Sequence, residues 1–172
     1  SPTDGDYYFG AFNSKAPYTT SPFYYNVNGK DIPVYSISVP IIENGSVIGV
    51  IGTDIDLSRI NSVMNQGTIL EKGYIFTLSP DESFATHKNE SIILNNIDST
   101  YLRDFADKLH DISLNGGTIS ETTYSDQIDE NILLYGKGVM IGNTDDYWIV
   151  CGIIPLSVIN SSYVILATVV TI

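Results

Sequence analysis

Two Asn-Gly pairs, at residues 28–29 and 44–45, are the features that most constrain the fold of this chain. Each pair lies between runs rich in β-branched and aromatic residues, and Asn-Gly is the strongest short signal for a two-residue hairpin turn. The runs span residues 21–27, 32–42 and 46–56. The sequence therefore predicts three consecutive antiparallel strands.

The pattern changes after residue 56. Apolar residues at helical spacing predict a short helix over residues 58–66 that begins at the N-cap Ser58. Beyond it, we expect a hairpin, then an amphipathic helix, then three strands. Their ranges are 73–78, 83–87, 99–114, 118–124, 132–141 and 147–154.

This order in the second half is typical of a PAS-like domain, in which an antiparallel sheet carries a helix across one face. The first half supplies only the last three strands of a comparable unit. The fold class expected is therefore α+β, with PAS-like antiparallel sheets, flanking helices and two modules in tandem, the first of them incomplete at its N-terminus.

Composition and net charge limit the kinds of partner that this chain can bind. The 172 residues are 43% hydrophobic and carry a net charge of −12, which predicts a globular chain. An acidic surface repels phosphate backbones, so nucleic acid is not an expected partner, whereas cations are attracted. The alternative interpretation is that the acidic charge only keeps the domain soluble. The single cysteine, Cys151, lies in an apolar run and is interpreted as a core residue.

The C-terminal run, residues 163–172, is uncharged and almost wholly apolar. Ten residues are too few to cross a bilayer, which takes about 20. The run is either a core element or the start of a transmembrane helix, and we expect the longer gene to continue it into an apolar span followed by Lys or Arg.

Five sequence blocks follow one another along nearly the whole chain: YYFGAF, SPFYYNVNGK, SISVPIIENGSVIGVIGTDIDL, GYIFTLSPDESFATH and YWIVCGIIP. In this order they resemble the double Cache sensor domains of bacterial and archaeal transmembrane receptors. The resemblance implies two stacked modules outside the cell, with the long N-terminal helix and first strands of the membrane-distal module absent. The implied parts are the end of the distal module (1–57), a connector (58–72), the proximal module (73–155) and a helix leading into a truncated transmembrane segment (156–172).

Asp54 is the candidate binding residue that the strand pattern itself singles out. Alternation places it on the same face as Gly52, which leaves room beside it. A carboxylate directed toward a core is unfavourable unless it is paired, and no Lys or Arg lies within the strand. Asp54 therefore either lies at an exposed strand end or awaits a donor from outside the strand.

The resemblance favours a ligand. In the amino-acid-binding branch of the family, the position similar to Asp54 receives the ligand's ammonium group. Tyr7 and Tyr8 match aromatic places of the motif Arg-x-Trp-Tyr-x-x-Ala, but Gly5 replaces its carboxylate-binding Arg. In the motif Pro-Tyr-x-Asp, Phe23 and Tyr25 replace the Tyr and the Asp.

The set Asp54, Tyr7, Tyr8, Phe23 and Tyr25 suits an amine or amino-acid-like ligand through charge pairing and cation–π contact, and the aromatic residues are also ordinary core material. No cofactor or metal is implied. The resemblance further implies a cytoplasmic signalling domain in the same full-length chain, a homodimeric receptor and a position outside the cell membrane.

An extracellular enzyme is the alternative. Alternation puts Asp54 and Asp56 on one face, about 6.6 Å apart along the strand, so the two form a possible carboxylate pair. No Ser/His/Asp set, metal-ligand spacing, calcium loop or dinucleotide fingerprint is present in the sequence.

Overall fold

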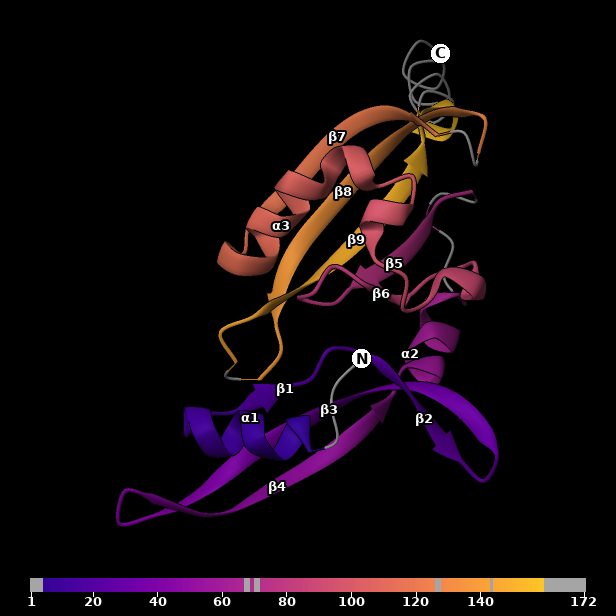
Figure 1. The fold of residues 1–172 in the computed structure, drawn as a ribbon. Coiled ribbons are helices and arrows are strands. Elements are labelled where there is room, and N and C mark those ends of the chain that lie inside the picture. Colours follow the sequence, from indigo (N-terminus) through magenta and orange to yellow (C-terminus); the bar gives the residue numbers. More distant parts are fainter. Residues whose placement is uncertain (1–4, 67–68, 70–71, 126–127, 143, 160–172) are drawn as a thin grey trace, which may run out of the picture.

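The computed structural model describes residues 5–66, 69, 72–125, 128–142 and 144–159, and these form two antiparallel sheets (Figure 1). The first sheet contains β1 (Tyr18–Thr19), β2 (Phe23–Val27), β3 (Lys30–Glu43) and β4 (Ser46–Asp56). The second contains β5 (Tyr74–Leu78), β6 (Phe84–Thr86), β7 (Thr118–Ser125), β8 (Glu130–Met140) and β9 (Tyr147–Pro155). The predicted class, α+β with PAS-like antiparallel sheets and flanking helices, is confirmed.

Both predicted hairpin turns form. The residue pairs 28–29 and 44–45 have φ angles of 53° and 83°, and of 49° and 78°. Two consecutive positive φ angles belong to a type I′ turn, whose twist matches that of paired strands. In the first sheet, β3 pairs with β1, β2 and β4, so it is the strand that organises the sheet.

The helices depart further from prediction. Helix α1 (Asp6–Ser14) was not predicted, because its aromatic residues and central Gly10 give no clear helical signal. A Cβ at Gly10 would lie 2.4 Å from the ring of Tyr18, so the glycine lets α1 pack against that ring. Helix α2 (Leu57–Met64) begins earlier than expected because Asp56, not Ser58, is its N-cap.

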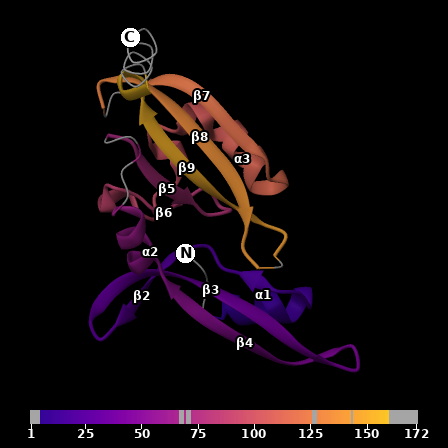
Figure 2. The same cartoon turned by 180° about the vertical axis from the view of Figure 1, so that it is seen from behind.

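The long helix expected over residues 99–114 is a shorter one, α3 (Ala106–Asn115), preceded by the 3₁₀ turns η2 (Ile97–Ser99) and η3 (Arg103–Phe105). The Thr100 hydroxyl donates to the carbonyl of Ile97 and accepts from the amide of Leu102, which favours turns over a continuous helix. Helix α3 covers one face of the second sheet, as the two opposite views show (Figures 1 and 2).

In the second sheet, strand order is β6-β5-β9-β8-β7, and one large apolar cluster of side chains fills the space between this sheet and its helices. Cys151 belongs to this cluster, as expected of a core residue, and burial raises the pKa of its thiol to about 12.

A smaller apolar cluster joins the two sheets. Its buried members are Tyr35 on β3, Leu57 on α2, Ala85 on β6 and Trp148 on β9. The rings of Tyr35 and Trp148 lie 4.6 Å apart between centroids. Trp148 Nε1 is buried and has no hydrogen-bond partner among the residues that the structure describes. We call this set the junction cluster.

His87 lies inside the aromatic core of the second sheet and is 2% exposed. Its Nδ1 accepts a hydrogen bond from the Asn89 amide at 2.9 Å, and its Nε2 lies 3.2 Å from the hydroxyl of Tyr101. Nδ1 also lies 3.3 Å from the carbonyl oxygen of Asn89, but the shorter bond from the Asn89 amide needs an unprotonated Nδ1 and favours the neutral imidazole with its proton on Nε2. Burial lowers the pKa of His87 below its ordinary value of 6.5.

This burial predicts an acid-sensitive core. Below pH 6.5, His87 takes up a proton in the unfolded chain but not in the folded one. The free energy of unfolding therefore decreases as the pH is lowered, by up to about 1.4 kcal/mol per pH unit. Urea unfolding between pH 5 and 7.5 measures the slope. We expect His87→Phe to reduce it and His110→Gln, which changes an exposed histidine, to retain the part due to His87. An unchanged slope in His87→Phe contradicts the assignment.

The predicted transmembrane start at residues 163–172 lies outside the described residues. Among the residues that are described, the helices are too short or too polar to span a bilayer.

Candidate functional site

Asp54 lies near the end of β4, directly opposite Ser36 on β3. The Ser36 hydroxyl donates to Asp54 Oδ1 at 2.6 Å. Asp54 is exposed, whereas Ser36 is 3% exposed. Asp54 is thus exposed near the strand end and also accepts from a donor on the neighbouring strand. Because this donor is a neutral hydroxyl group, the negative charge of the carboxylate remains uncompensated at this contact.

Ser36 is itself held on both backbone groups. Its amide donates to the Thr20 hydroxyl at 3.0 Å, and its carbonyl accepts from the Thr20 amide at 3.0 Å. Thr20 follows β1 and is 2% exposed. A line of polar contacts thus runs across the sheet from the buried Thr20 through the buried Ser36 to the exposed Asp54.

Helix α1 approaches the same face of the sheet. Residues directly opposite each other in an antiparallel pair point to one face, so Ser38 and Gly52 share the face of Ser36 and Asp54. The Ser38 hydroxyl donates to the carbonyl of Tyr7 on α1 at 2.6 Å. The first turns of α1 therefore lie one cross-strand pair away from Asp54.

The space predicted beside Gly52 is only partly open. A Cβ placed there would lie 3.0 Å from the carbonyl oxygen of Ile37 and 3.4 Å from Ser38 Cβ. The nearest atoms belong to β3, so the glycine accommodates the neighbouring strand as well as the face on which Asp54 lies.

The predicted aromatic residues occupy two elements. Phe23 and Tyr25 alternate along β2 opposite Val34 and Ile32, which puts both on the face of Asp54. Their rings meet edge to face at 6.5 Å. Tyr8 stacks on Phe12 within α1 at 5.7 Å, and Tyr7 is 47% exposed.

The register thus gathers Asp54, Phe23 and Tyr25 on one face and brings the Tyr7 backbone close to it. Among the described residues, the side chain of Asp54 forms one hydrogen bond, which comes from Ser36. The salt bridges between described residues join Lys108 to Glu121 and His110 to Glu82, so they do not involve Asp54. Sequence reasoning missed Ser36, Ser38 and Thr20. The alternation of serine with apolar residues in SISV is the signal that points to the first two.

Asp56 has a different role from Asp54. Its carboxylate accepts a hydrogen bond from the amide of Ser58 at 2.8 Å and caps α2. An N-cap side chain is bound to the backbone by this contact. The two carboxylates proposed as a pair are therefore held by different elements.

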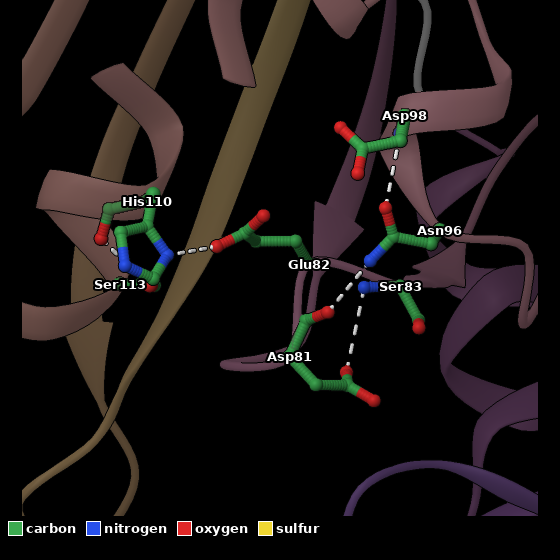
Figure 3. Close-up of polar contacts among 7 residues, drawn as sticks. All are labelled: Asp81, Glu82, Ser83, Asn96, Asp98, His110 and Ser113. Carbon is green, nitrogen blue, oxygen red and sulfur yellow. Dashed lines mark hydrogen bonds and ion pairs between the residues drawn. The ribbon is translucent and has the colours of Figure 1, made fainter. Parts of the chain in front are cut away.

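A second group of acidic residues lies at the turn between β5 and β6 (Figure 3). Glu82 pairs with His110 of α3, and Asn96 donates to the carbonyl of Asp81 at 2.9 Å while accepting from the amide of Asp98 at 3.0 Å. These contacts tie the turn to η2 and α3. Glu82, Asp81 and Asp98 therefore have structural roles, because each contributes to the contacts that hold this turn in place.

Comparison with known proteins shows that the first part of the chain is similar to receptor sensor domains. Residues 1–62, which include β1 to β4 and most of α2, match the family model described as "Methyl-accepting chemotaxis protein-like, first PDC sensor domain". The chain is 27% identical over 95 residues to the methyl-accepting chemotaxis protein PscA of Pseudomonas syringae pv. tomato. The predicted resemblance to receptor sensor domains is confirmed.

Solved sensor domains share the fold. The extracellular domain of mmHK1S-Z3, a protein assigned as a histidine kinase, superposes with a TM-score of 0.73 at 21% identity over 94% of this chain and 57% of that one. The ligand-binding domain of the Pseudomonas aeruginosa PAO1 amino acid chemoreceptor PctC, solved in complex with GABA, gives a TM-score of 0.63 at 18% identity over 86% of this chain and 60% of that one.

The chain spans less than two thirds of each of these proteins. The match to PscA includes 55% of this chain and 15% of PscA. At such identities, the solved structures establish the fold alone, and any ligand of this chain has to be argued from its own residues.

Proposed function

We propose that this chain is the extracellular ligand-sensing part of a transmembrane signalling receptor and that it binds an amine or amino-acid-like organic cation at Asp54. The observation that carries the proposal is an exposed carboxylate, fixed by a buried serine, on a sheet face that also bears Phe23 and Tyr25. Such a set binds an ammonium group by charge pairing and cation–π attraction.

Charge supports a cation over an anion. The chain carries a net charge of −12, and the Asp54 carboxylate forms no salt bridge with another described residue. Gly5, at the place of the carboxylate-binding Arg, has φ of 85°, and an added Cβ would lie 3.1 Å from the Phe9 ring. This backbone disfavours any side chain at position 5, so the site is not built to hold a ligand's carboxylate through that position.

The wider organisation belongs to the same proposal. Residues 1–57 form the end of a membrane-distal module and residues 73–155 a proximal one, joined by residues 58–72. A cytoplasmic signalling domain in the full-length chain and a homodimeric receptor complete it. The match of residues 1–62 to a chemotaxis-receptor sensor model supports this organisation over an extracellular enzyme that uses Asp54 and Asp56.

Three four-carbon probes test the ligand class: butylammonium, 4-aminobutyrate and butyrate. They differ in the charged groups at their ends, and each contains four carbon atoms. A ligand that binds only the folded state at a hundred times its Kd adds about 2.7 kcal/mol to the free energy of unfolding. We expect thermal stabilisation to be largest with butylammonium, smaller with 4-aminobutyrate and absent with butyrate. Equal stabilisation by butyrate contradicts a cation site.

A further inference from the structure

Ser36 combines a buried position with a hydrogen bond to an exposed charged group. A buried hydroxyl is unfavourable unless it is hydrogen-bonded, and Ser36 meets this need by donating to Asp54 Oδ1. An exposed carboxylate, in contrast, is readily solvated by water. The bond therefore matters less for the solvation of Asp54 than for its orientation, because it holds one oxygen of the carboxylate against the sheet.

We infer that Ser36 is a positioning residue for the ligand site and that Thr20 keeps it in place. The inference rests on the proposed function. With Oδ1 engaged by Ser36, the second oxygen, Oδ2, accepts no hydrogen bond from another described residue and is available to the ammonium group of a ligand. The carboxylate is thereby preorganised, so less side-chain freedom is lost when the cation binds.

Thr20 makes this orientation rigid. Its amide and hydroxyl bond the carbonyl and amide of Ser36, both at 3.0 Å, so the Ser36 backbone cannot rotate without breaking two buried hydrogen bonds. The neighbouring Ser38 is occupied differently, because its hydroxyl donates to the carbonyl of Tyr7. Ser36 is thus the hydroxyl on this face that acts on the carboxylate, while Ser38 holds α1.

The test is calorimetric titration of the 172-residue chain with butylammonium chloride, accompanied by a melting curve for each variant. Ser36→Ala removes the hydroxyl, and we expect binding to weaken about 3- to 10-fold, as for the loss of one ordinary hydrogen bond. Ser36→Thr restores the donor and should recover most of the affinity. The control Ser113→Ala also removes a buried hydroxyl, which donates to the carbonyl of His110 in α3, and should leave binding unchanged.

The background of Asp54→Asn separates positioning from a general structural effect. If Ser36 acts through Asp54, Ser36→Ala causes no further loss of affinity when the carboxylate is already absent. An equal loss in both backgrounds, or wild-type affinity in Ser36→Ala, overturns the inference while the cation site stands. Absence of butylammonium binding by the wild-type chain overturns the proposed function, and the positioning role with it.

Discussion

Replacing Trp148 by alanine is expected to lower the free energy of unfolding by about 3–5 kcal/mol, the usual cost of truncating a large buried aromatic residue. Trp148 is 5% exposed and contacts Tyr35, and the junction cluster around it also includes Leu57 and Ala85. Since this cluster joins the two sheets, its loss should also make their unfolding less cooperative. Urea unfolding followed by far-ultraviolet circular dichroism measures both effects.

Trp148→Phe is the matched control. It keeps an aromatic ring at the junction and removes the indole N–H, which is buried without a partner among the described residues. An unpaired buried donor costs about 1–3 kcal/mol, so its removal offsets part of the lost ring area. We expect a loss clearly smaller than that of Trp148→Ala, because most of the buried aromatic surface is retained. Similar losses for the phenylalanine and alanine variants contradict a packing role for this ring.

Asp54→Asn is expected to weaken butylammonium binding by about 1.5–3 kcal/mol, the contribution of a hydrogen bond to a charged group. The substitution preserves shape and removes the negative charge that the ammonium group pairs with. The unliganded protein should change little in stability, because the amide oxygen of asparagine can still accept from Ser36.

Calorimetric titration and a melting curve on the same variant separate the two effects. A carboxylate that serves only to satisfy Ser36 predicts the reverse result, a loss of stability with no change in ligand response. Asp56→Asn is the comparison variant: it keeps an N-cap oxygen on α2 and removes a negative charge at the helix N-terminus, so it should reduce stability by about 0.3–1 kcal/mol and leave binding intact. Undiminished butylammonium binding by Asp54→Asn removes Asp54 from the site.

Local sequence signals predicted the described strands except the two-residue strand β1. The two Asn-Gly turns determine both hairpins of the first sheet, and the predicted and observed bounds of β4 agree. These features depend on residues that are adjacent in the chain. The same is true of Gly116, which ends α3 with φ of 70°.

Features that depend on tertiary contacts were not predictable in this way. Helix α1 forms where Gly10 meets the ring of Tyr18, a contact that no local pattern displays. Ser36 and Thr20 read as ordinary strand residues until the pairing of β3 places one beside Asp54 and the other behind it. Asp56, which the sequence offered as the carboxylate partner of Asp54, instead caps helix α2 in the place predicted for Ser58.

Consecutive residues of β3 serve opposite faces of the first sheet: Ser36 touches Asp54, and Tyr35 touches Trp148. A displacement of the peptide that carries Ser36 therefore also moves the ring of Tyr35. Trp148 is the single tryptophan of the chain, and its indole is shielded from solvent at this contact. Its fluorescence emission is consequently an intrinsic, label-free optical reporter of any change in how the two sheets meet, including one that begins at Asp54.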